Sequence, residues 1–77
     1  MTPKMPRVTG ADLLRALKRA GWYEIRITGS HHQLNHADRP GVLITVPVHA
    51  GKQVPVGTLG KILGDAGLTG DELRKLI

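Results

Sequence analysis

Histidine is concentrated in one short segment of this 77-residue chain. Three of its four histidines, His31, His32 and His36, fall within six residues, and the fourth is His49. An imidazole can exchange a proton near neutral pH, and its neutral form is the commonest metal ligand in proteins. The cluster therefore raises two chemical possibilities, a metal site and acid–base catalysis.

The spacing of the cluster disfavours a metal site. Along an extended strand, residues i and i+4 lie roughly 13 Å apart, and residues i and i+2 roughly 6.6 Å apart. Zinc holds its ligand nitrogens at about 2.0 to 2.1 Å, so His32 and His36 cannot readily share an ion in a strand. The chain has no cysteine, and no carboxylate adjoins the cluster. We therefore expect no metal and no cofactor.

The residues around the cluster predict three antiparallel strands. Residues 22–28 alternate between apolar and polar side chains, which is typical of a half-buried strand. Its apolar positions are Tyr23, Ile25 and Ile27. Gly29–Ser30 makes a short turn into a second strand over residues 31–36, and a third strand covers residues 42–48. The connections are too short for a crossover helix. Because Pro47 has no amide hydrogen, the third strand should lie at an edge or end there.

Helices are predicted before and after the strands. Thr9 with Asp12 has the spacing of a capping box and starts a helix over residues 10–20. A second helix begins between residues 54 and 58 and ends at Gly67. Thr69 with Glu72 starts a short final helix. The expected fold is α+β, in the order α-β-β-β-α-α, with the helices on one face of the sheet. Residues 1–8 are expected to be a flexible N-terminus and residues 9–77 a single domain.

Strand alternation separates the histidines by face. If Leu34 faces the helices, His32 and His36 do so too, and His31 lies on the open face. His31 also follows Gly29–Ser30, whose backbone N–H groups can approach a phosphate closely. RNA cleavage needs such an imidazole, which takes a proton from the ribose 2′-OH so that this oxygen attacks its own adjacent phosphate. This reaction needs no metal.

The charge balance points to a polyanionic partner. Eleven Lys and Arg residues against six Asp and Glu residues give a formal charge of +5. Nucleic acid is the first candidate and an acidic protein the second. Aromatic content of 3% argues against stacking of successive bases on aromatic rings. We find no apolar stretch long enough to span a bilayer and no secretory signal, so we expect a cytoplasmic protein without a membrane partner.

Each of these features also has a simpler explanation. An exposed histidine is usually an ordinary surface residue, and Gly29–Ser30 would serve equally as a hairpin turn. The G-x-x-G pattern at residues 67–70 resembles the loop of KH domains, but a helix stop and an N-cap explain it. A DNA-reading helix-turn-helix over residues 58–77 is disfavoured, because Asp71 and Glu72 would face phosphate.

Four segments in order resemble the HicA family, also called YcfA-like, of small mRNA interferase toxins. The resemblance runs from Thr9 to about Leu73. Its segments are a helix ending in Ala20-Gly21-Trp22, then Gly29-Ser30-His31-His32, then Thr45-Val46-Pro47-Val48-His49, and finally Gly57-Thr58-Leu59 through Asp65-Ala66-Gly67-Leu68. The resemblance implies a fold similar to double-stranded RNA-binding domains. It also implies the toxin of a type II toxin–antitoxin system, which cleaves mRNA without metal and is neutralised by a HicB-type antitoxin.

Matched residue by residue, the essential histidine of the family falls on His31. His32 stays in reserve, because some members carry this histidine one position later. His49 matches a recurrent histidine after the third strand, and its role as acid, phosphate ligand or loop-ordering residue stays open. The family often has an aromatic residue where this chain has Leu34, so base stacking is not expected there.

The mechanism that follows is a hypothesis with two rivals. His31 acts as general base, Gly29 and Ser30 orient the phosphate, and Arg26 or Lys52 stabilises the negative charge that develops. One rival is a non-catalytic RNA-binding module with the same fold. The other is a basic domain that binds an acidic protein.

Overall fold

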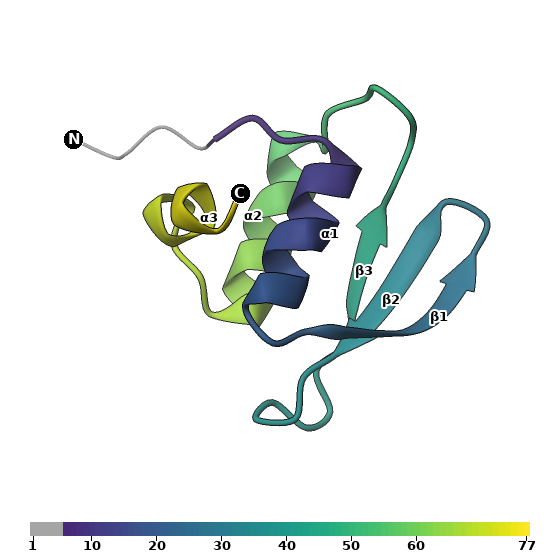
Figure 1. Ribbon diagram of the computed structural model, residues 1–77, viewed down its shortest axis with the longest axis vertical. Coiled ribbons are helices and arrows are strands. Elements are labelled where there is room, and N and C mark those ends of the chain that lie inside the picture. The colour runs from purple at the N-terminus through teal and green to yellow at the C-terminus, as the bar shows by residue number, and fades with distance from the viewer. Residues whose placement is uncertain (1–5) are drawn as a thin grey trace.

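The computed structural model describes residues 6–77 and has the predicted element order (Figure 1). Its elements are α1 (Gly10–Arg19), β1 (Tyr23–Thr28), β2 (His31–Asn35), β3 (Ile44–Pro47), α2 (Val56–Ala66) and α3 (Gly70–Leu76). The expected α+β class, with three antiparallel strands between helices, is therefore confirmed and matches the pattern of double-stranded RNA-binding domains.

The helix ends follow the capping residues of the sequence. The Thr9 hydroxyl accepts a hydrogen bond from the Asp12 amide at 3.1 Å and starts α1. A complete capping box starts α3. The Thr69 amide donates to Glu72 Oε1 at 3.0 Å, and the Glu72 amide donates to the Thr69 hydroxyl at 3.1 Å. Gly67 ends α2 in the left-handed conformation, with φ +70°. Local signals therefore determine where these helices begin and end.

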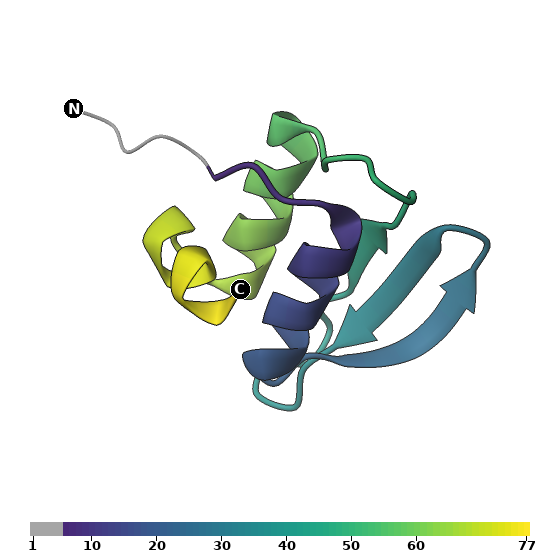
Figure 2. The same cartoon turned by 45° about the horizontal axis from the view of Figure 1, so that its top comes forward.

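The sheet has the strand order β1-β2-β3, and both neighbouring pairs are antiparallel. As predicted, β3 lies at an edge and ends at Pro47. The helices cover one face of the sheet, and the β1–β2 hairpin projects away from them (Figures 1 and 2). The core lies between the two layers. Its largest fully buried side chains are Leu13, Leu17, Leu34, Ile44, Val46, Leu59 and Leu73.

The expected half-burial of the first strand is wrong. Tyr23, Ile25 and Ile27 are 51%, 50% and 55% exposed. One reason is position, because β1 is an edge strand and the main sheet contacts of α1 and α2 are with β3. The other reason is a shift of register between Glu24 and Arg26, which interrupts the alternation of faces. A period-two pattern therefore identified the strand correctly but not its burial.

His36 joins the end of β2 to the end of α1. Its Nε2 lies 3.0 Å from the Ala20 carbonyl oxygen, and its Nδ1 accepts a hydrogen bond from the Asp38 amide at 3.0 Å. The ring also meets the buried Trp22 edge-on, with centroids 5.1 Å apart. Gly21 adopts φ +100°, and a Cβ there would lie 2.6 Å from His36 Nε2. Both ring nitrogens of His36 are thus engaged in structure.

The N-terminal segment takes part in the packing from Val8 onwards. Val8 is 4% exposed, and its carbonyl accepts a hydrogen bond from the Val54 amide at 2.8 Å. The flexibility expected for residues 1–8 falls partly on residues 1–5, which lie outside the described residues. Within residues 6–77, no helix is both long and apolar enough to cross a membrane.

Candidate functional site

The turn between β1 and β2 is tight and open to solvent. Thr28 pairs with His31, so Gly29 and Ser30 alone connect the two strands. Gly29 has φ +57°, and nothing lies within 4 Å of where its Cβ would be. A two-residue hairpin turn with glycine first fits type II′ geometry. A bulky anion can therefore approach the backbone of this turn without meeting a side chain.

His31 lies on the open face of the sheet and is exposed, as the alternation predicts. On that face it sits between Thr28 of β1 and Pro47 of β3. Leu34, on the other face of β2, is fully buried beneath the helices. Within residues 6–77, the His31 ring has no hydrogen-bonding partner. Both of its ring nitrogens are therefore available to a substrate.

Positive charge near His31 is not compensated by acids. Arg26 pairs with Gln33 on the same face, two residue pairs along from His31, and Lys52 is exposed in the loop after β3. Neither cation has an ion-pair partner among the described residues. Four other cations, namely Arg15, Lys18, Lys61 and Arg74, pair with Asp12, Glu24, Asp65 and Asp71. Arg26 and Lys52 can therefore attract a polyanion without competition from an acidic side chain.

The loop after β3 leaves the sheet at the same end as the Gly29–Ser30 turn (Figure 1). The Val48 amide donates to the Ser30 carbonyl oxygen at 2.7 Å, one residue beyond the end of β3. His49 follows directly and is exposed. The Lys52 amide then donates to the His49 carbonyl oxygen at 3.0 Å, which closes a turn. The fold thus brings the backbone of His49 next to the Gly29–Ser30 turn, and the chain then continues through Lys52 to Gln53, which bridges to Thr9 at the start of α1.

His32 points to the helix side of the sheet and has partners there. Its Nδ1 lies 3.3 Å from Glu24 Oε1, and the same oxygen lies 3.0 Å from Lys18 Nζ of α1. The register shift in β1 creates this contact, because it pairs Glu24 with Leu34 and so turns the carboxylate toward the helices. Sequence reasoning missed Glu24, and nothing in the sequence marks the bulge. His31 and His32 are therefore on opposite faces of the sheet.

Lys18 and His32 also affect the ionisation of Glu24. The hydrogen bond from Lys18 has the largest effect and lowers the pKa of the Glu24 carboxyl. Burial opposes it, and the weaker effect of the hydrogen bond from His32 lowers the pKa further. A lowered pKa means that the ionised carboxylate stabilises the fold above the ordinary glutamate pKa of about 4.3. This stabilisation is lost as the pH falls through the folded-state pKa.

Substitution Glu24→Gln tests this charge dependence. We expect urea unfolding to show lower stability than wild type at pH 7, and a smaller difference at pH 3, because the wild-type carboxyl becomes protonated as the pH falls through its folded-state pKa. Asp65→Asn, which removes an exposed ion pair with Lys61, should have little effect at either pH. An equal deficit of Glu24→Gln at both pH values would mean that the carboxylate charge is not responsible.

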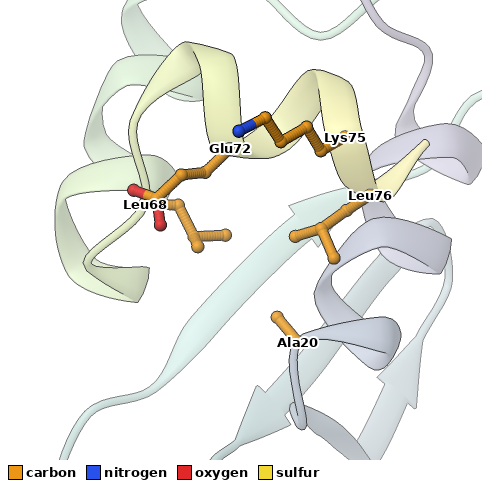
Figure 3. Close-up of a pocket in the computed structure, with 5 residues that line it drawn as sticks. All are labelled: Ala20, Leu68, Glu72, Lys75 and Leu76. Carbon is orange, nitrogen blue, oxygen red and sulfur yellow. The ribbon is translucent and has the colours of Figure 1, made fainter.

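Among the described residues, those around His31 form neither a cluster of three metal-ligand side chains nor the pocket described next. Among residues 6–77, no three His, Asp or Glu side chains gather closely enough to hold a metal ion. An open pocket of about 360 Å³ lies instead between the end of α1 and α3 (Figure 3). It is lined by Ala20, Leu68, Glu72, Lys75 and Leu76, none of which belongs to the sheet. The site around His31 is thus an exposed surface of the sheet and its loops.

Fold and site together define a small basic α+β protein that presents an imidazole beside an open glycine turn. Residues 10–68 match the model of the family described as HicA toxin of bacterial toxin–antitoxin. Because the match covers most of the chain, this protein belongs to the HicA toxin family, which confirms the resemblance found in the sequence. No curated protein matches the chain. The match ends before α3, whose Leu73 is fully buried.

Proposed function

We propose that this toxin is an endoribonuclease that cleaves mRNA in the cytoplasm without a metal ion. One observation carries the proposal: the exposed His31 imidazole has no partner within the described chain and adjoins the open Gly29–Ser30 turn. Uncompensated positive charge on Arg26 and Lys52 supports it, because RNA must be held against its own negative charge. Membership of a toxin family is consistent with an activity that harms the cell.

The reaction uses a nucleophile that the substrate supplies. His31 takes the proton from a ribose 2′-OH, and the freed oxygen forms a bond to the adjacent phosphorus. The bond from phosphorus to the 5′-oxygen of the next nucleotide then breaks. The products are a 2′,3′-cyclic phosphate and a 5′-hydroxyl end. The Gly29 amide and Ser30 orient the phosphate, and Arg26 or Lys52 stabilises the charge that builds up on it.

A protein partner is the second part of the proposal. Because the family belongs to toxin–antitoxin systems, we propose that a HicB-type antitoxin binds this protein. The net charge of +5 favours an acidic antitoxin surface. Such a surface, docked on the open face of the sheet, would cover His31 and so block access to RNA.

The direct test is incubation of the purified protein with a long single-stranded RNA, with and without EDTA. We expect cleavage in both reactions, with cyclic phosphate ends detected by mass spectrometry. Inhibition by EDTA would overturn the metal-free reaction. Tight RNA binding without any cleavage would instead favour the non-catalytic RNA-binding module. RNA affinity no higher than a salt-sensitive background would favour a basic domain that binds an acidic protein.

A further inference from the structure

His49 follows the end of β3, beside the turn that leads into β2. Along β3, Ile44 and Val46 are buried and Val48 packs against the core, whereas Pro47 pairs with His31. The hydrogen bond from the Val48 amide to the Ser30 carbonyl oxygen continues the antiparallel pairing by one residue. His49 comes directly after Val48 and is exposed, so its backbone adjoins the Gly29–Ser30 turn that precedes His31.

The backbone of His49 is anchored on both sides. Before it, Val48 is bonded to Ser30, and Gly10 packs so closely on Pro47 and Val48 that an added Cβ would overlap them. After it, the turn closes from Lys52 to His49, and the isolated bridge of Gln53 to Thr9 follows at once. Gly51 adopts φ +71° within this turn. A short turn tied at both ends therefore holds the His49 backbone directly after the residue that is bonded to Ser30.

Strand cleavage leaves a strongly basic oxygen that needs a proton. When the bond from phosphorus to the 5′-oxygen breaks, this oxygen takes the electron pair, and His31 cannot donate while it is accepting the 2′ proton. Guanidinium and ammonium groups in general hold their protons too firmly near neutral pH to be good acids. An imidazole has a pKa close to neutrality, which suits a general acid.

The other two histidines are committed elsewhere. His36 uses both ring nitrogens, toward the Ala20 carbonyl and the Asp38 amide. His32 lies on the helix side of the sheet, bonded to Glu24. Among the histidines of the described chain, His31 and His49 are the two whose rings have no hydrogen-bonding partner.

We infer that His49 is the general acid of the cleavage reaction, paired with His31 as general base; this inference rests on the proposed function. His31 takes the 2′-OH proton as the bond from the 2′-oxygen to phosphorus forms. The bond from phosphorus to the 5′-oxygen breaks, and the His49 imidazolium gives its proton to that oxygen. His31 ends protonated and His49 neutral, and exchange with water restores both.

A substrate that needs no acid tests the inference. An oligonucleotide with one ribonucleotide is prepared in two forms, with either oxygen or sulfur bridging the phosphorus and the 5′-carbon at the cleavage site. A thiolate leaves without protonation. His49→Ala should therefore cleave the oxygen substrate about 10²- to 10⁴-fold more slowly than wild type, and the sulfur substrate at close to the wild-type rate. His31→Ala should be impaired on both substrates.

Lys52→Ala is the matched control, because it removes a cation from the same turn. It should slow both substrates by the same factor, as expected for a residue that only holds phosphate. The same pattern in His49→Ala, with equal losses on both substrates, would overturn the inference and leave His49 a phosphate ligand or a loop-ordering residue. A wild-type protein that cleaves neither substrate would instead overturn the proposed function, so the two failures are distinguishable.

Discussion

His31→Ala is expected to lower the rate of RNA cleavage by about 10²- to 10⁴-fold, the usual contribution of one general acid–base group. The side chain is exposed and has no hydrogen-bonding partner within residues 6–77, so its removal creates neither a cavity nor an unsatisfied polar group. Surface substitutions of this kind change stability by about 0.5 kcal/mol at most. Single-turnover cleavage of a labelled RNA measures the first effect, and thermal unfolding measures the second.

Two neighbouring residues provide the controls for that experiment. Gln33→Ala alters the same face of β2, two residues from His31, without removing a titratable group, and should retain most of the activity. His32→Ala removes the partner of Glu24 on the opposite face and should affect stability more than chemistry. If His31→Ala kept wild-type activity and a folded His32→Ala lost its activity, His32 would be the general base instead of His31.

Among substitutions of glycine by alanine in this chain, Gly10→Ala is expected to lower the free energy of unfolding most. An added Cβ would overlap the Pro47 carbonyl oxygen and lie 2.8 Å from Val48 Cα, and both are backbone atoms. Because a backbone cannot rotate away as a side chain does, α1 or the end of β3 must move. Overpacking of this kind costs about 1 to 3 kcal/mol. For a domain of this size, that corresponds to a fall in Tm of roughly 4 to 8 °C for each kcal/mol.

Gly64→Ala is the matched control for Gly10→Ala. Gly64 lies within α2, is exposed, and has nothing within 4 Å of its Cβ position. Alanine there should stabilise the helix by up to about 1 kcal/mol. Displacement of Pro47 and Val48 should also move His49, so a folded Gly10→Ala variant should lose cleavage activity as well. Equal unfolding temperatures for the two variants would show that α1 and β3 are not tightly packed at Gly10.

The helix α3 lies outside the residues that match the family and is held in place by contacts of its own. The Arg19 guanidinium of α1 donates to the Leu76 carbonyl oxygen at 2.6 Å, and Leu73 is fully buried in the core. The capping box at Thr69 was readable from the sequence, because a cap depends on residues three positions apart. The packing of α3 against α1, however, joins residues that are far apart in the chain.

Local patterns alone determined the order of the elements, the helix caps and the face on which each strand histidine lies. Alternation along β2 depends only on the buried Leu34, so His31 could be assigned to the open face from the sequence. The same reasoning failed in β1, because Ile25 is an extra residue between the pairs that Glu24 and Arg26 form with β2. The resulting shift of register turns Glu24 toward His32, and no local sequence pattern predicts it.

Only the tertiary structure decided which distant residues share the site. The contact of Val48 with Ser30 and the close approach of Gly10 to Pro47 place His49 beside the turn that carries His31. These contacts link segments separated by loops, and their geometry depends on how the whole core packs rather than on the residues next to them. The sequence therefore determined that His31 is presented to solvent, and the packing of α1 against the end of β3 decided what stands beside it.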